Sequence, residues 1–290
     1  MANKGHYQKT GGSRQGIYVC SPRGVLLSSV NSLNPDIVLE TIQEGLQKWS
    51  HLSESDSRLP KDFTPKTQHR WEDSYPSNGL VLKGAKADLL SDPPQFSIRG
   101  DRWNMDHIWF SNNESQMWIP TNLTKGQKHE LPEIIKERLF RFHLVDNVRG
   151  QTLPFAPQEI MKAHLYSQIT NITHTTIDLK ITGNSYAVAK GPWLLGINDW
   201  TPSQDLDHSI STDLIGKATY NINSQSFTNF ELVALCKWTG KTQNNGRSFG
   251  PESGKIGIFY QLSEKSTTAD RIAPAFVDLY NADWILKPKK

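Results

Sequence analysis

The sequence predicts an α+β chain, in which a truncated strand–strand–helix unit precedes a mainly antiparallel β-sheet or barrel domain with few helices. Two short apolar runs followed by one helical pattern indicate the small unit. Several long strand patterns separated by turn signals indicate the larger domain. We therefore divide the 290 residues into a small unit over 1–60, a linker over 61–78 and a β-rich domain over 79–290.

The small unit begins with two predicted strands, over 16–20 (GIYVC) and 25–30 (VLLSSV). The turn between them, SPRG, has proline and glycine where a tight reversal uses them. Asn34 is a candidate helix N-cap, and Pro35 stands at the first helical position. Apolar residues then recur at helical spacing, which predicts a helix from Pro35 to Trp49.

The larger domain has one clear helical pattern and several strand patterns. The helix is expected over 132–143, and the C-terminal segment over 273–286 is rich in aromatic residues. Strands are expected over 79–82, 95–99, 106–110, 160–170, 175–188, 216–222, 227–238 and 256–262. In the strand over 227–238, apolar residues at alternate positions predict one buried face.

Composition excludes some classes of partner. The 32 basic and 29 acidic residues are interspersed, so no concentrated basic face for nucleic acid is expected. No apolar run has the length of a membrane span. The polar residues 1–16 lack the apolar core of a secretory signal. The expected location is therefore the cytoplasm, or outside it if an upstream segment carries a signal.

The two cysteines, Cys20 and Cys236, form no C-x-x-C pair, which excludes the usual dithiol redox motif and a four-thiolate zinc site. Two buried thiols and a long-range disulfide both stay open. The chain has no P-loop, dinucleotide fingerprint or G-x-S-x-G elbow, so we expect no cofactor.

The strand–turn–strand–helix pattern over 16–49 resembles the second half of a thioredoxin-like domain. The strand–helix unit that carries the redox C-x-x-C is missing, and Ser13, Arg14 and Gln15 stand where the family has a cis-proline. The resemblance implies a redox-inactive, N-terminally shortened form of a longer protein. Residues 100–107 (GDRWNMDH), 141–151 (RFHLVDNVRGQ) and 240–247 (GKTQNNGR) resemble uncharacterised bacterial proteins with a β-rich domain after such a segment, which implies architecture and no activity.

The densest polar run follows the predicted helix and holds His143, Asp146, Asn147, Arg149 and Gln151. A histidine beside a carboxylate can act as a general base. The favoured structural reading is that the histidine complements the dipole of the helix C-terminus and that the charged residues cap or pair with one another.

A second run, over 101–107, reads as a strand. Arg102, Asn104 and Asp106 then point one way, and His107 points the other. A metal site would need His107 turned inward against that alternation, so that two histidines and two aspartates converge, and the spacing carries no metal motif. The favoured interpretation is an Arg–Asp pair on a strand whose other face is an aromatic core face, so we assign no metal site.

The third run is a glycine-bounded loop after the apolar strand. Gln243, Asn245 and Arg247, with Trp238 nearby, would suit a sugar or peptide, because aromatic rings stack on apolar faces and amides bind hydroxyls. The structural alternative is a turn that uses Asn and Gly for backbone reasons. Convergence of the three runs on one cavity would indicate a binding site.

The absence of a complete catalytic motif favours a non-enzymatic binding or interaction protein, with a small molecule, glycan or protein as partner. Its ligand-binding candidates are Arg102, Asn147, Arg149, Gln151, Trp238, Gln243, Asn245 and Arg247. The alternative is a hydrolase or metal-assisted enzyme that uses His107, His143, Asp106 and Asp146. A second alternative is a protein related to thiol–disulfide oxidoreductases that lacks its catalytic half.

Overall fold

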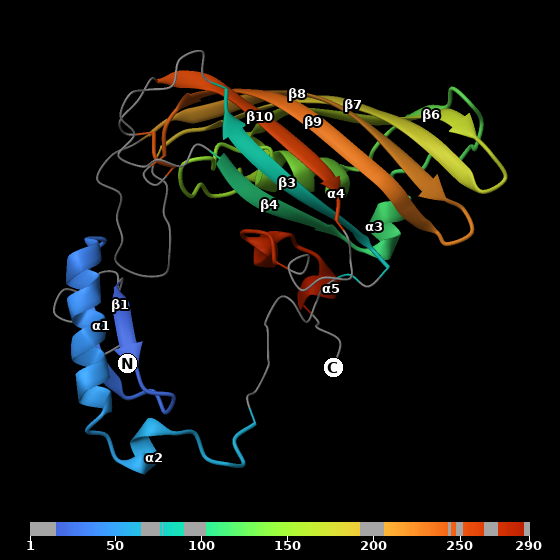
Figure 1. The fold of residues 1–290 in the computed structure, drawn as a ribbon. Coiled ribbons are helices and arrows are strands. Elements are labelled where there is room, and N and C mark those ends of the chain that lie inside the picture. Colours follow the sequence, from blue (N-terminus) through green and yellow to red (C-terminus); the bar gives the residue numbers. More distant parts are fainter. Residues whose placement is uncertain are drawn as a thin grey trace. The chain divides into compact units, whose positions relative to one another are not determined.

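The structure is a computed structural model. It describes residues 16–64, 76, 78–89, 103–191, 206–242, 245–247, 252–263 and 272–286. The chain forms two compact units, Met1–Thr67 and Gln68–Lys290, each of which contains its own elements (Figure 1). The division between the units lies inside the segment expected to be a linker.

The first unit is a β-hairpin covered by a helix. Strands β1 (Ile17–Cys20) and β2 (Leu26–Val30) pair antiparallel, and α1 (Pro35–Trp49) and the short α2 (Glu54–Ser57) follow. The predicted helix over Pro35–Trp49 is confirmed, and the Asn34 side chain caps it by accepting from the Asp36 amide at 2.9 Å. A Cβ on Gly45 would lie 2.5 Å from Val19 Cγ1, so glycine is what lets α1 approach β1 closely. The thioredoxin-like character of this unit stays a prediction.

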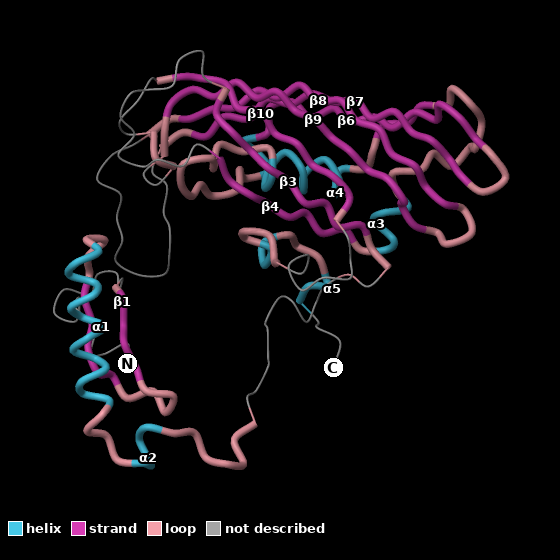
Figure 2. The backbone as a smooth tube through the Cα atoms, in the orientation of Figure 1, coloured by secondary structure: helices cyan, strands magenta, loops and turns pink. Residues whose placement is uncertain are grey.

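The second unit is built on an eight-stranded antiparallel sheet with the strand order β4-β3-β10-β9-β8-β7-β6-β5 (Figure 2). The prediction of a mostly antiparallel, β-rich domain with few helices is confirmed. The strands are β3 (Leu80–Asp88), β4 (Trp103–Phe110), β5 (Lys128–Glu130), β6 (Ile160–Ile172), β7 (Thr176–Ala189), β8 (His208–Asn221), β9 (Ser226–Gly240) and β10 (Ser253–Leu262). The strand predicted over 95–99 lies outside the described residues.

Short helices lie on one face of this sheet, which we call the inner face (Figure 1). They are α3 (Asn112–Gln116), α4 (Glu133–Glu137), the π-helix η3 (Arg138–His143) and the 3₁₀-helix η4 (Pro157–Glu159). The helix expected over 132–143 is therefore present, but it begins as an α-helix and ends as a π-helix. The 3₁₀-helix η6 (Val277–Leu279) and α5 (Asp283–Leu286) form the C-terminal segment.

The main core fills the space between the inner face and these helices. Alternate residues of each strand point inward, and the predicted buried face of β9, from Phe230 to Trp238, is confirmed. The Trp118 ring makes edge-on contacts with Phe110 and Phe230, at centroid distances of 5.8 and 5.0 Å. A smaller core forms where the C-terminal segment packs on Val81 and Trp109. The opposite, outer face of the strands carries exposed side chains, except where the C-terminal segment covers Val81 and Trp109.

Candidate functional site: two buried polar networks

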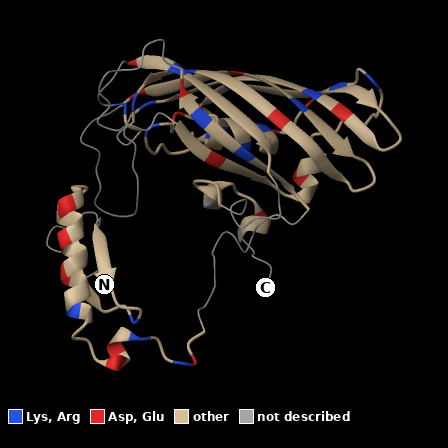
Figure 3. Cartoon of the chain, in the orientation of Figure 1, with Lys and Arg blue, Asp and Glu red and all other residues tan. Residues whose placement is uncertain are grey.

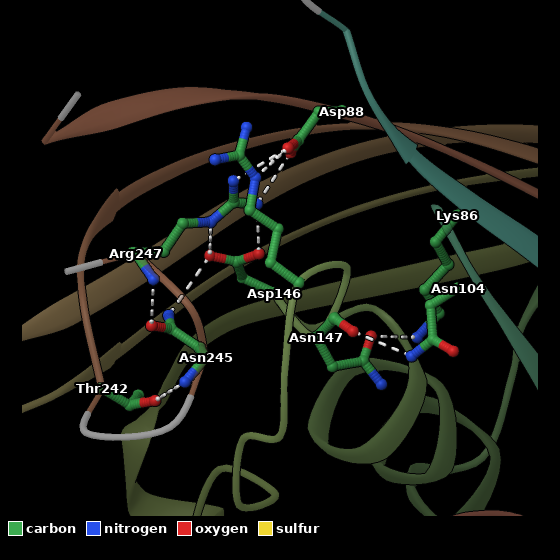
Figure 4. Close-up of polar contacts among 9 residues, drawn as sticks. Lys86, Asp88, Asn104, Asp146, Asn147, Thr242, Asn245 and Arg247 are labelled. Atoms are coloured by element: carbon green, nitrogen blue, oxygen red, sulfur yellow. Dashed lines mark hydrogen bonds and ion pairs between the residues drawn. The ribbon is translucent and has the colours of Figure 1, made fainter. Parts of the chain in front are cut away.

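The three polar runs of the sequence meet under one end of the sheet, around two inward-facing charged residues of β3, Lys86 and Asp88 (Figure 4). Antiparallel pairing places β4 on one side of β3 and β10 on the other. The segment after η3 and the loop after β9 approach the same region from the inner side. The contacts divide into an Asp106 network and an Arg247 cluster.

The Asp106 network is centred on one carboxylate that receives four donors. Asp106 Oδ2 lies 3.0 Å from Lys86 Nζ, 2.7 Å from His143 Nδ1 and 3.0 Å from the Tyr260 hydroxyl. Its Oδ1 accepts from the His107 amide at 2.9 Å. The Tyr280 hydroxyl bonds His143 Nε2. This arrangement fixes His143 as the tautomer that carries its proton on Nδ1.

Burial and the contacts between neighbouring groups together set the charge states in this network. Burial would raise the pKa of Asp106, but His143 and Lys86 outweigh it and hold that pKa well below its ordinary value. Burial lowers the pKa of His143, so the imidazole is neutral. Burial and the nearby Asp106 raise the pKa of Tyr260 and Tyr280 well above their ordinary value. The network is therefore one Lys86–Asp106 ion pair surrounded by neutral donors.

The Arg247 cluster holds two carboxylates on one guanidinium. Arg247 contacts Asp88 through two nitrogens, at 2.8 and 3.0 Å, and Asp146 through two, at 2.6 and 2.9 Å. Arg149 Nε donates to Asp88 at 2.6 Å, and the Asn245 amide donates to Asp146 at 3.3 Å. The cluster therefore contains two arginines and two aspartates that balance in charge.

The geometry of the Arg247 cluster makes it a clamp on the loop that follows β9. The guanidinium lies 4.1 Å from the centre of the Trp238 ring, a cation–π contact, and the Arg247 side chain is buried. The backbone N–H of Asn245 donates to Thr242 Oγ1 at 3.1 Å. Burial raises the pKa of Asp146, while the Arg247 contacts oppose that rise. These contacts attach the loop to β3 and to the segment after η3.

The π-helix explains why His143 reaches the network. In a π-helix residue i bonds residue i+5, and the Leu144 amide bonds the Leu139 carbonyl at 2.8 Å. Arg138 and His143 are also five apart, so they lie on the same side of the wide turn. Both contact Tyr280: the Arg138 guanidinium lies 4.8 Å from its ring centre, and His143 bonds its hydroxyl. Arg138 also pairs with buried Glu114, with a 2.7 Å contact from its second nitrogen.

The structure brings together only some of the candidate catalytic residues. Asp106 and His143 touch, but Asp146 pairs with Arg247, and His107 lies on the opposite face of β4. The four side chains that a metal-assisted enzyme would need therefore do not converge. Within the described part of the chain, no three His, Cys, Asp or Glu side chains are grouped as metal ligands.

The candidate ligand-binding residues are also divided. Asn147, Arg149, Asn245 and Arg247 take part in the networks, and Trp238 lies buried under Arg247. Gln151 is exposed and lies outside them. Arg102 and Gln243 lie outside the described residues.

The sequence reasoning missed Lys86, Asp88, Tyr260 and Tyr280. A signal for the first two exists: Leu80, Leu82, Lys86 and Asp88 share one face of a strand with period two. The expected strand ends at 82, whereas the alternation continues through β3 to Lys86 and Asp88. The tyrosines carry no such signal, because only the strand register and the C-terminal segment bring them to Asp106.

The chain Asp106–His143–Tyr280 has the connectivity of a catalytic triad, but its environment is unsuited to one. An activated nucleophile needs a lowered pKa, whereas the pKa of Tyr280 is raised. His143 has 0 % of its surface exposed, which leaves no path for a substrate to its ring. The Asp106 network satisfies buried polar groups and joins β3, β4, η3, β10 and the C-terminal segment.

The cysteines offer no redox pair either, since neither Cys20 nor Cys236 forms a disulfide. Burial raises the pKa of the Cys236 thiol from 9.0 to about 11, which lowers its thiolate fraction at neutral pH about 100-fold. We expect iodoacetamide to alkylate half-buried Cys20 in the native chain and to reach Cys236 only after unfolding, as peptide mass mapping would show. Equal labelling of the two cysteines under native conditions would contradict the burial of Cys236.

The outer face of the sheet, unlike the inner one, presents apolar side chains to solvent. Met105, Ala85, Phe259, Val233 and Ile215 stand in register on five adjacent strands, and we call them the apolar row. Ile215 is 61 % exposed and Val233 53 %, although both are β-branched residues suited to burial in a sheet. A hollow of about 430 Å³ begins at Ile215 and Val233 and extends to Tyr166 and Lys128.

No family model matches the chain, and neither a curated protein nor a solved structure matches it. Among the described residues, no helix has the length and apolar character to cross a membrane.

Proposed function

We propose that this protein is a non-enzymatic binding or interaction protein and that it binds its partner on the outer face of the large sheet. The observation that carries the proposal is the apolar row, a set of exposed side chains in cross-strand register. Scattered exposed apolar residues are ordinary, but a contiguous apolar patch is typical of an interaction surface.

The polar networks support the same proposal from the other side of the sheet. Asp106, Asp146 and Glu114 are each buried and paired with a cation, so these carboxylates are not available as a general acid or base. Their charges are used in holding strands, loop and C-terminal segment together. A surface for a partner therefore has to be sought elsewhere, and the apolar row is exposed.

The test is a thermal-shift screen of the full chain against peptide, glycan and metal libraries, repeated with the double variant Val233→Thr, Ile215→Thr. Threonine keeps the β-branched shape and removes the apolar character. We expect peptide hits whose affinity falls at least tenfold in the double variant. Thr228→Val is the matched control: it adds an apolar side chain on the same strand, at an exposed position beyond the apolar row.

Two results would overturn the proposal. One is that no peptide, glycan or metal in the three libraries changes the melting temperature of the chain. The other is a set of hits, of whatever class, that bind the wild-type chain and the double variant equally well.

A further inference from the structure

We infer that the outer face takes an acidic amphipathic helix of a partner protein, which lies along the apolar row between two rows of lysines. This inference rests on the proposed function and names the chemistry of its partner. It is carried by the charges that border the apolar side chains and by the dimensions of the band between them.

Lysines border the apolar row on one side. Cross-strand pairing places Lys83, Lys217 and Lys180 in the next outward row of the sheet. Lys217 and Lys180 are exposed, and Lys217 forms an ion pair with Glu231 of the same row at 3.1 Å. Along this border the cations outnumber the carboxylates.

A second border lies on the other side, beyond one intermediate row. That intermediate row includes Gly257 and Leu235, which is 40 % exposed, so it widens the apolar surface into a band. The same row also holds one exposed carboxylate, Asp213, beside Leu235, so the band is apolar except at this position. Lys255 and Lys237 face each other in the row that follows, and both are exposed. Figure 3 shows that both basic and acidic positions are distributed over the strands of the large sheet.

The dimensions of the band fit a helix. Outward-facing rows are about 6.6 Å apart along a strand, so the two lysine rows lie about 20 Å apart at the backbone. A helix with its side chains is about 10–12 Å wide, which leaves room for lysine side chains to reach carboxylates on both flanks. Five strands about 4.8 Å apart give the apolar row a length of about 19 Å, which is the length of a helix of about 13 residues.

The surface relief of the band favours a helix over a flat bilayer as the partner. On a sheet face side chains stand roughly perpendicular to the strands, so their lengths set the relief. Alanine at 85 and valine at 233 are shorter than the bordering lysines and than Phe259 and Met105 of the same row, so the band is a shallow valley at these two positions. A helix with one apolar stripe fills a valley, whereas a bilayer would meet the lysines first. The hollow at Tyr166 and Lys128 extends the valley at its β6 end.

Charge also excludes a second copy of this chain as the occupant. A two-fold contact through the band would bring the lysine rows of both copies together, and like charges in close contact oppose association. An acidic helix instead complements both borders, in the manner of other helix-in-groove contacts.

The experiment uses designed 18-residue helical peptides as probes of the full chain, with affinity measured by fluorescence anisotropy at low and high salt. The first peptide has one leucine stripe flanked by glutamates. The second has the same composition with the leucines scattered, and the third has lysines in place of the glutamates. We expect the first to bind at least tenfold more tightly than the other two and to weaken as salt rises.

Charge reversal on the protein tests the borders directly. The double variant Lys180→Glu, Lys237→Glu changes one exposed lysine on each border. We expect it to lower the affinity for the acidic peptide at least tenfold and to raise the affinity for the basic peptide. Lys125→Glu, an exposed lysine in the turn before β5, is the matched control that leaves both unchanged.

The outcomes separate this inference from the proposed function. If the three peptides bind through Val233 and Ile215 with equal affinity, whatever their charge or the placement of their leucines, the acidic-helix inference is overturned. The proposed function would still stand. Binding to phosphatidylserine vesicles with no binding of the acidic peptide would assign the band to a bilayer instead. If no library peptide binds to the band, both the helix inference and the proposed function are overturned.

Discussion

Replacing Asp106 by Asn is expected to lower the free energy of unfolding by about 3–5 kcal/mol, because the substitution leaves the Lys86 ammonium buried without its counter-charge. The side chains of Lys86 and Asp106 are 0 % and 6 % exposed, so water cannot replace the lost contact. Urea denaturation measures the change. The variant keeps the shape of the carboxylate, so the loss reports charge and hydrogen bonding and not volume.

A double-mutant cycle supplies the control for Asp106. Adding Lys86→Met removes the unpaired cation, so the double variant should be more stable than the sum of the two single losses by about 0.5–3 kcal/mol. Additive losses would show that the two charges are not coupled.

The same variant should change how stability depends on pH. The pKa of Asp106 is lowered in the folded chain from its ordinary 3.8, so its stabilising contribution is present above that value and is lost as the pH falls below it. The difference between wild type and Asp106→Asn should therefore be largest near pH 7 and shrink toward pH 3. A difference that stays constant over this range would contradict the ionised state assigned to Asp106.

Replacing Arg247 by Met is the second change with a large expected effect, again about 3–5 kcal/mol of unfolding free energy. Asp88 and Asp146 would lose their shared guanidinium, and Arg149 could compensate only Asp88. Arg247→Lys should recover only part of the loss, because one ammonium cannot make four directed contacts with two carboxylates. Urea denaturation followed by tryptophan fluorescence suits the measurement, since Arg247 stacks on Trp238.

The matched control for Arg247 is Lys217→Met, in the same compact unit. Lys217 pairs with Glu231 on the outer face, and the side chains are 68 % and 38 % exposed. Removing such a pair should change the unfolding free energy by less than about 1 kcal/mol. Equal effects of the two substitutions would show that the Arg247 cluster is not a structural clamp.

Local patterns in the sequence were sufficient for much of the fold. The N-cap Asn34 and the apolar spacing after Pro35 define a helix without help from distant residues. The alternation from Phe230 to Trp238 likewise defines the buried face of β9. These are short-range signals. The folded chain keeps the structures that they predict because tertiary packing buries the same apolar positions.

Longer strands and the π-helix were not predictable in the same way. Strand β3 extends to Asp88 because Lys86 and Asp88 bond buried partners that lie far along the chain. From the local sequence alone, two charged residues indicate the end of a strand. Strand β8 begins at His208 because β7 and β9 pair with it over that length. No local spacing marks the change from α-helix to π-helix at Arg138.

The candidate site shows the same division. The polar runs were visible as sequence, but their meeting depends on pairs such as Asp88 with Arg247, which are 159 residues apart. The apolar row is less visible still. Its members come from five strands, and only the cross-strand register places Met105, Phe259 and Ile215 in one line.

The most direct test of where this protein binds is methyl NMR of the full chain titrated with the acidic amphipathic peptide. Binding on the outer face predicts shift changes for the methyl groups of Val233, Ile215 and Leu235, with little change at Val145 and Val148 beside the buried networks. Changes confined to Val145 and Val148, with the outer-face methyl groups unmoved, would contradict the account and move the binding site to the inner side of the sheet.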